Sequence, residues 1–136
     1  MANFLYDICI NLTYTKQIDW SAGTNFSIIG VTSGYTPSSS ADQHLSDIAS
    51  GDRVTGIVAV SGGFSFAART FKFSSTILPA VTNGATITAI VLLINTGTES
   101  TSTLLGYFDT GLDLPITGTG ADIAVTPDGT SGLFNT

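Results

Sequence analysis

Apolar residues near the start of the chain recur at a helical interval. The spacing i, i+1, i+4, i+5, i+8 predicts a short amphipathic helix or helical turn. The residues with this spacing are Phe4, Leu5, Ile8, Cys9 and Leu12. Because Ile8, Ile10 and Leu12 also alternate, an extended arm that docks on a neighbouring subunit is the alternative. We assign residues 1–23 to this N-terminal helix or arm and residues 24–136 to a single β-sandwich domain.

After residue 24 the chain consists of short runs of β-branched and aromatic residues, which predict strands. Gly, Asn, Asp, Ser and Pro separate these runs, as they do in hairpins and short loops. The predicted strands are 25–31, 54–60, 64–73, 86–94, 103–108 and 122–125. The fold class that follows is all-β: a mainly antiparallel β-sandwich or small barrel, jelly-roll-like.

The run from residue 87 to residue 94 is apolar at nearly every position, which predicts a central strand buried on both faces. Strand periodicity assigns alternate residues to opposite faces. One predicted face carries Ile87, Ala89, Val91 and Leu93, and the other carries Ile90, Leu92 and Ile94. Within 64–73, alternation predicts that the phenylalanine rings share one face and that Ser65 and Lys72 lie on the other.

Residues 33–52 are polar and contain no predicted strand. A loop of this length is uncommon in a compact domain unless it binds something. Three aspartates lie within it, Asp42, Asp47 and Asp52, and they are candidates for contacts with a basic surface on a partner.

The charge content of the chain is low. It has 4 Lys and Arg against 10 Asp and Glu, a net charge of −6, and charged residues make up 10% of the sequence, compared with about 25% in an ordinary domain. So few cations do not form the basic footprint of a nucleic-acid or membrane-surface binder. The composition instead predicts a homo-oligomer, or a subunit that buries much of its surface against other proteins.

The sequence has few of the residues from which catalytic or metal sites are built. Cys9 is the one cysteine and His44 the one histidine, so neither an intrachain disulfide nor a zinc site is expected. Asp109 and Asp113 are possible calcium ligands, but no calcium-loop pattern surrounds them. We therefore predict no cofactor and no metal.

The segment Tyr107-Phe108-Asp109-Thr110-Gly111 resembles the active-site turn of aspartic proteases, in which two such turns bring their carboxylates together. Leu112 stands where that family usually has a small residue, and no second family signature follows near the C-terminus. Asp-Thr-Gly is also ordinary hairpin-loop chemistry. We interpret Asp109 as a turn residue and predict that the protein is not an enzyme.

Several other segments carry a second resemblance. They are Ile18-Asp19-Trp20, the loop end His44-Leu45-Ser46-Asp47-Ile48, the run 95–117 and the strand 122–125. These segments are similar to a family of small proteins encoded among the structural genes of tailed bacteriophages, with residues 53–85 the most divergent part. The shared positions are mainly turn residues between apolar strands, so the resemblance identifies no catalytic site.

The resemblance implies a virion accessory protein, in the first place a capsid decoration or cement protein that stabilises the shell. A tail, neck or baseplate component is the alternative, and a ligand- or carbohydrate-binding β-sandwich module is the second alternative. The implied partners are the major capsid protein or other virion subunits. The implied location is the virion, assembled in the host cytoplasm.

Two sets of residues are candidates for contacts with such a lattice. The apolar set is Phe4, Leu5 and Ile8, and the acidic set is Asp42, Asp47 and Asp52. A carbohydrate-binding module would instead expose aromatic rings on a loop face. Trp20 and Tyr35 are the candidates for that role, although Trp20 follows an apolar residue just ahead of the first strand and is predicted to lie in the core.

Overall fold

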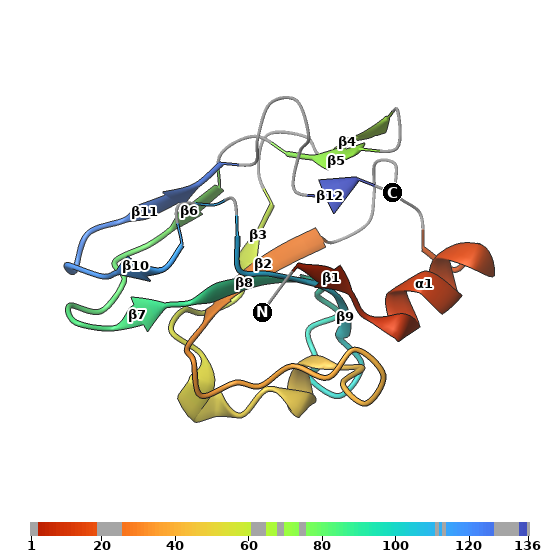
Figure 1. The fold of residues 1–136 in the computed structure, drawn as a ribbon, viewed down its shortest axis with the longest axis horizontal. Coiled ribbons are helices and arrows are strands. Elements are labelled where there is room, and N and C mark those ends of the chain that lie inside the picture. The colour runs from red at the N-terminus through yellow and green to blue at the C-terminus, as the bar shows by residue number, and fades with distance from the viewer. Residues whose placement is uncertain are drawn as a thin grey trace.

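The computed structural model describes residues 3–18, 26–60, 65–67, 70–73, 76–110, 112, 114–126 and 134–135. Its largest element is a five-stranded antiparallel sheet with the order β1-β9-β8-β2-β3. In that order, the strands are Phe4–Leu5, Thr103–Phe108, Ala89–Ile94, Phe26–Val31 and Val58–Ala59. This central sheet runs through the middle of the molecule, with other segments above and below it (Figure 1).

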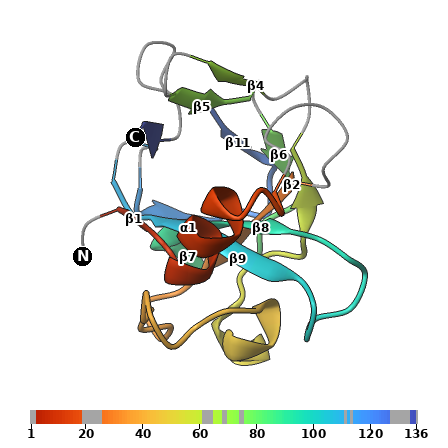
Figure 2. The ribbon, with the colours of Figure 1, turned by 90° about the vertical axis from the view of Figure 1, so that its right-hand side faces the viewer.

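Three small antiparallel sheets accompany the central sheet. The first pairs β10 (Ile116–Thr117) with β7 (Thr86–Ile87), and the second pairs β11 (Ile123–Val125) with β6 (Thr76–Leu78). The third has the order β12-β5-β4, formed by Phe134–Asn135, Thr70–Lys72 and Ser65–Ala67. The pair of β10 with β7 lies at the end of the central sheet, where β7 leads into β8, and the other two small sheets lie on one side of it (Figures 1 and 2). The predicted fold class, all-β and mainly antiparallel with a short N-terminal helix, is confirmed.

The central sheet separates two apolar cores. The first core lies between the sheet and the small sheets, and β8 contributes Ile90 and Leu92 to it. The second core lies on the opposite face, and β8 contributes Ala89, Val91 and Leu93 to it. These five side chains are fully buried, which confirms the predicted central strand.

One residue of this strand was assigned to the wrong face. Ile87 packs in the first core with Ile90 and Leu92, and not with Ala89 and Val91. The run 86–94 is divided at Thr88, whose backbone N–H and hydroxyl both donate to the carbonyl of Val31. β7 then pairs with β10 in a different sheet. The alternation of side chains between the two faces is therefore interrupted at Thr88.

Strand β9 contains a similar break in its alternation. Leu93 is opposite Leu104, whereas Leu92 is opposite Gly106, so Leu105 is an extra residue on β9. This β-bulge lets Leu104 and Tyr107, three positions apart, reach the same core.

The N-terminal segment is part extended and part helical. Phe4 and Leu5 form β1, which pairs with Tyr107 and Gly106 of β9. The helix α1 then runs from Asp7 to Tyr14, so it begins later than the apolar spacing predicted. The extended part therefore folds back onto its own chain, and Cys9 on α1 is buried in the first core.

Most predicted strands are present, but several are shorter than the runs that predicted them. β9 has the predicted bounds, and the run 54–60 keeps two residues in strand conformation, as β3. The run 64–73, predicted as one strand, contains two strands, β4 and β5, which pair antiparallel. β6, β10 and β12 were not predicted. The predicted alternation of rings in 64–73 falls largely on side chains outside the described part of the structure, as does the predicted core position of Trp20.

The burial of β8 leads to a first prediction, that Val91→Asp prevents folding. An unpaired buried charge costs several kcal/mol, which is a large part of the roughly 5–15 kcal/mol that stabilises a small domain. Circular dichroism and thermal denaturation measure the outcome. Tyr14→Asp, at a side chain that is 84% exposed, is the control and should fold. A Val91→Asp protein that is soluble and unfolds cooperatively would contradict the central position of β8.

Candidate functional site

The long polar loop covers the second core. We call residues 32–53 the cover layer; it contains two short 3₁₀ helices, Leu45–Asp47 and Ser50–Asp52. Figure 1 shows it below the central sheet, on the side away from the small sheets. Tyr35, Leu45 and Ile48 point into the second core and are buried. The length of the loop therefore has a structural cause, because β8 would otherwise expose an apolar face.

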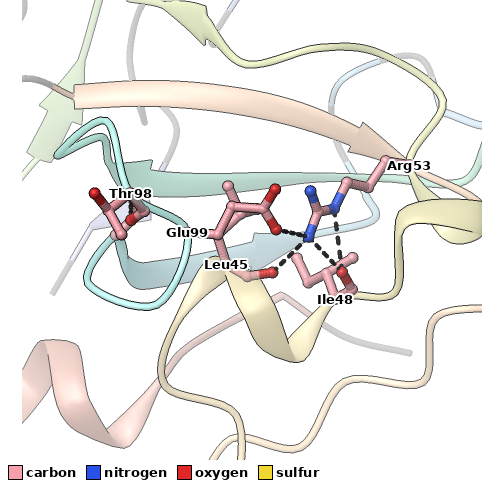
Figure 3. Close-up of polar contacts among 6 residues, drawn as sticks. Leu45, Ile48, Arg53, Thr98 and Glu99 are labelled. Atoms are coloured by element: carbon pink, nitrogen blue, oxygen red, sulfur yellow. Dashed lines mark hydrogen bonds and ion pairs between the residues drawn. The ribbon is translucent and has the colours of Figure 1, made fainter.

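Arg53 fastens the end of the cover layer (Figure 3). Its Nη2 donates to the carbonyls of Leu45 at 2.9 Å and Ile48 at 2.6 Å, and its Nε donates to Ile48 at 3.1 Å. The same Nη2 lies 2.8 Å from Oε1 of Glu99 on the turn between β8 and β9. Arg53, which directly follows the second 3₁₀ helix, thus ties the first one to the β8–β9 turn, and its side chain is only 15% exposed.

The β8–β9 turn, residues 95–102, is held by its own hydroxyl groups. The carbonyl of Thr98 accepts from the backbone N–H groups of Thr101 and Ser102 and, at 2.8 Å, from the Ser102 hydroxyl. Ser102 is buried, and its carbonyl accepts from the N–H of Leu45. The turn presents Glu99 to Arg53, and that ion pair holds the pKa of Glu99 below its usual range.

A chain of hydroxyl groups joins the N-terminal segment to the cover layer. The Tyr35 hydroxyl donates to Oδ2 of Asp42 at 2.8 Å, and the Tyr6 and Tyr35 hydroxyls are 2.7 Å apart. Because Tyr35 uses its proton on the carboxylate, Tyr6 must be the donor to Tyr35. Burial raises the pKa of both phenols, so both stay protonated. Tyr35 is therefore a core residue and not an exposed ligand-binding ring.

The three loop aspartates hold turns of the cover layer. Oδ2 of Asp42 also accepts from the N–H of Ser38 at 2.9 Å. Oδ2 of Asp47 accepts from the N–H groups of Gln43 and His44, at 2.8 and 3.0 Å, and these bonds lower the pKa of Asp47. Asp52 acts through its backbone, since its carbonyl accepts from Thr32. Asp47 is the exposed member, whereas Asp42 and Asp52 are half-buried.

The apolar candidates of the N-terminal segment pack largely within their own chain. Phe4 stacks on Tyr107 and meets the edge of Tyr6, with ring centroids 5.5 and 5.2 Å apart. Phe4 and Ile8 pack against the second core, and Leu5 packs against the first. All three are half-buried. The two candidate sets therefore have different roles. Phe4, Leu5 and Ile8 anchor β1 and α1 to the sheet, whereas the three aspartates hold turns of the cover layer.

Asp109 lies directly after β9, where the chain leaves the sheet. The backbone N–H groups of Asp109 and Thr110 donate to Oδ1 of Asn3 at 2.8 and 3.1 Å. This arrangement joins the end of β9 to Asn3, the residue ahead of β1. Asp113, the other proposed calcium ligand, lies outside the described residues.

The described part of the chain contains Cys9, His44 and seven of the ten acidic residues. No group of three or more His, Cys, Asp or Glu side chains there is arranged to hold a metal ion. Burial raises the pKa of the Cys9 thiol to about 11, so this cysteine is unreactive at neutral pH. No helix among these residues is long and apolar enough to cross a membrane.

Sequence analysis missed both the anchoring role of Arg53 and the apolar residues that remain exposed. Among the described residues, the large exposed apolar side chains are Ile10, Tyr14, Ile57 and Ile77. Arg53 could have been noticed as a cation between two apolar segments in a chain with few cations. The exposure of Ile77 had no sequence signal, because β6 was not predicted.

Comparison of the sequence with models of known protein families and with curated proteins gives no match.

The contacts of Arg53 lead to a second prediction. Arg53→Ala should lower the free energy of unfolding by about 2–4 kcal/mol, because hydrogen bonds to a charged group contribute about 1.5–3 kcal/mol each. Arg53→Lys should recover part of the loss, since an ammonium group cannot reproduce the paired Nε and Nη2 hydrogen bonds to the Ile48 carbonyl. Urea denaturation measures the effect. Glu99→Gln is the control and should change the midpoint little, because Glu99 is 58% exposed. Equal effects of Arg53→Ala and Glu99→Gln would contradict the anchoring role.

Asp47 leads to a third prediction, about pH. Its pKa is lowered in the folded state, so its stabilisation is complete above the unfolded pKa of about 3.9 and is lost as the pH falls through the folded value. Asp47→Ala should therefore be less stable than the natural protein at pH 7, by about 1 kcal/mol as for a lost helix cap. The two proteins should converge in stability near pH 2.

Ser46→Ala, at the exposed neighbouring position, is the matched control. It should follow the natural protein at every pH when urea midpoints are compared. A difference between Asp47→Ala and the natural protein that persists undiminished at pH 2 would show that the carboxylate is not its cause.

Proposed function

We propose that this protein is a non-enzymatic structural protein of a tailed-bacteriophage virion, and that it acts as a capsid decoration or cement protein. It binds the major capsid protein and stabilises the shell. This role requires a rigid surface that adheres to other proteins, and it requires no active site.

The observation that carries the proposal is the scarcity of charge in a chain that contains 15 Ser and 21 Thr. Only 4 cations and 10 anions share an accessible surface of 6629 Å². Several of these charges are already used inside the molecule: Arg53 pairs with Glu99, while Asp42 and Asp47 accept backbone hydrogen bonds. Association through such a surface rests on apolar contacts and hydroxyl groups, as in a subunit added to a protein lattice.

The anchoring of the cover layer also supports this role. Arg53, the Tyr6–Tyr35–Asp42 chain and the β8–β9 turn fix a loop of about twenty residues that would otherwise be flexible. A surface that is already ordered loses little conformational entropy on binding. This favours a protein that clamps a lattice by rigid contact over a module whose loops close around a small ligand.

A salt titration of purified phage particles tests the mode of binding, and it is our fourth prediction. Apolar contacts are not screened by salt, whereas exposed ion pairs weaken beyond a Debye length of about 8 Å at physiological ionic strength. The protein should therefore stay on the particles in about 1 M NaCl, as followed by sedimentation and gel analysis. Asp52→Asn, which removes a loop charge, should also stay bound. Release at moderate salt would favour docking of the acidic loop on a basic shell surface.

The number of copies per phage particle tests where in the virion the protein lies. Gel densitometry should find the protein in a fixed, high ratio to the major capsid protein. A few copies per particle would support the tail, neck or baseplate alternative. Absence from particles, together with binding to a glycan array, would support the carbohydrate-binding alternative and overturn the proposal.

A further inference from the structure

Two segments of the chain pair with each other beyond the ends of their short strands. β6 pairs with β11, and β7 pairs with β10. Between these two pairs, the N–H of Gly118 donates to the carbonyl of Ala85 at 2.7 Å, and further backbone hydrogen bonds join Val81 to the opposite segment. We call residues 76–87 and 116–125 the ribbon, which lies at the left of Figure 1. Its antiparallel pairing thus continues, with interruptions, along its whole length.

Asn83 and Gly84 form an exposed turn on the ribbon. The N–H of Ala85 donates to the carbonyl of Thr82 at 3.1 Å, which closes the turn around these two residues. Gly84 has a φ of +86°, as a type II turn requires at its third residue. A Cβ on Gly84 would meet no atom within 4 Å, so nothing crowds the main chain at this point. An exposed carboxamide therefore precedes a residue that has no side chain to shield its backbone nitrogen.

This dipeptide is chemically labile, because asparagine is a thermolabile residue and a following glycine adds no Cβ that hinders attack by its nitrogen. When the Gly84 nitrogen loses its proton to solvent, it can attack Cγ of Asn83. The new N–Cγ bond closes a succinimide ring, the Cγ–Nδ2 bond breaks, and the side-chain nitrogen leaves as ammonia after taking up a proton from water. Water then opens the ring at either carbonyl, which gives aspartate or isoaspartate.

In the folded protein the attacking nitrogen is already engaged. The N–H of Gly84 donates to the carbonyl of Gly118 at 2.9 Å. The two segments approach closely here, because a Cβ on Gly118 would overlap the carbonyl oxygen of Thr82. The Gly84 nitrogen must therefore give up a hydrogen bond of the ribbon before it can lose its proton and turn toward Cγ of Asn83.

We propose that Asn83 is a site of spontaneous deamidation, and that the Gly84–Gly118 hydrogen bond confines the reaction to molecules in which the ribbon has opened locally. The product adds one carboxylate to a chain of net charge −6. Isoaspartate also adds a methylene group to the main chain at residue 83, which shifts Gly84 out of register with Gly118. A ribbon that has opened and reacted is thereby kept open. None of these steps depends on a role in the virion.

Peptide mass spectrometry tests the proposal on the whole chain, incubated in the same mildly alkaline buffer with and without guanidinium chloride. Residue 83 should gain the mass of deamidation in both samples. The gain should be at least about tenfold slower in the folded protein, because a paired segment is open only a small part of the time. Asn11 is the internal control: it is exposed on α1 but precedes Leu12, so it should stay unmodified.

A pair of glycine variants tests the hydrogen bond itself. Gly118→Ala should speed the modification of Asn83 in the folded protein several-fold, since the added methyl group forces the two segments apart. Gly51→Ala is the matched control and should keep the natural rate, because Gly51 is an exposed glycine of the cover layer with open space around it. Circular dichroism shows whether both variants fold.

No mass gain at residue 83 in guanidinium chloride overturns the site. Equal rates in the folded and the unfolded natural protein overturn the restraint by the ribbon, as does a folded Gly118→Ala protein that reacts no faster than Gly51→Ala. If Gly118→Ala does not fold, the ratio of the two rates in the natural protein decides.

Discussion

The burial of both faces of β8 is the constraint on which the rest of the molecule depends. A strand that is apolar on both sides must be covered on both sides, since each exposed aliphatic side chain forfeits about 1.5–3 kcal/mol of burial. The small sheets supply one cover, and they bring Leu78, Val81 and Val125 to the first core. A loop without strands supplies the other cover, using Tyr35, Leu45 and Ile48. The molecule is thus a three-layer structure in which only two layers are sheet.

A layer without strands has no continuous ladder of hydrogen bonds. Isolated backbone bridges, such as the one between His44 and Thr103, and polar side chains hold it together. Arg53 binds carbonyls of the cover layer, Asp42 and Asp47 bind its N–H groups, and the Tyr6–Tyr35 pair ties it to the N-terminal segment. These groups come from two separate parts of the sequence, the N-terminal segment and residues 32–53. Several of the few charges in the chain therefore have structural roles within the fold.

The elements that could be predicted from sequence are those whose signal is local. β9 and β2 follow from β-branched and aromatic runs with turn residues on each side, and the burial of β8 follows from its lack of polar residues. The face of Ile87 could not be predicted, because the break at Thr88 depends on a hydrogen bond to Val31 from a distant strand. β6 and β10 are only three and two residues long and exist through their pairing with β11 and β7.

In the candidate site, too, local features could be predicted from the sequence and contacts with distant segments could not. Sequence composition was enough to select Asp42, Asp47 and Asp52 as polar groups of a long loop, but not to reveal that two of them accept backbone hydrogen bonds. Phe4, Leu5 and Ile8 were selected as an apolar set, and their packing against Tyr107 and the two cores depends on the return of β1 to β9. In both cases the sequence does not reveal which distant segment of the chain packs against these residues.

The way in which Arg53 holds the cover layer has a consequence for how this protein can evolve. Its guanidinium binds main-chain carbonyls of Leu45 and Ile48, which every amino acid possesses, and only Glu99 contributes a side chain. The layer can therefore accept many substitutions at exposed positions such as Ser46 and Ala49 without losing its attachment. Homologues could then diverge quickly across the loop while Arg53 and the buried Leu45 and Ile48 positions change slowly. Lineages that share this architecture would be recognised by one arginine and the spacing of two aliphatic residues before it.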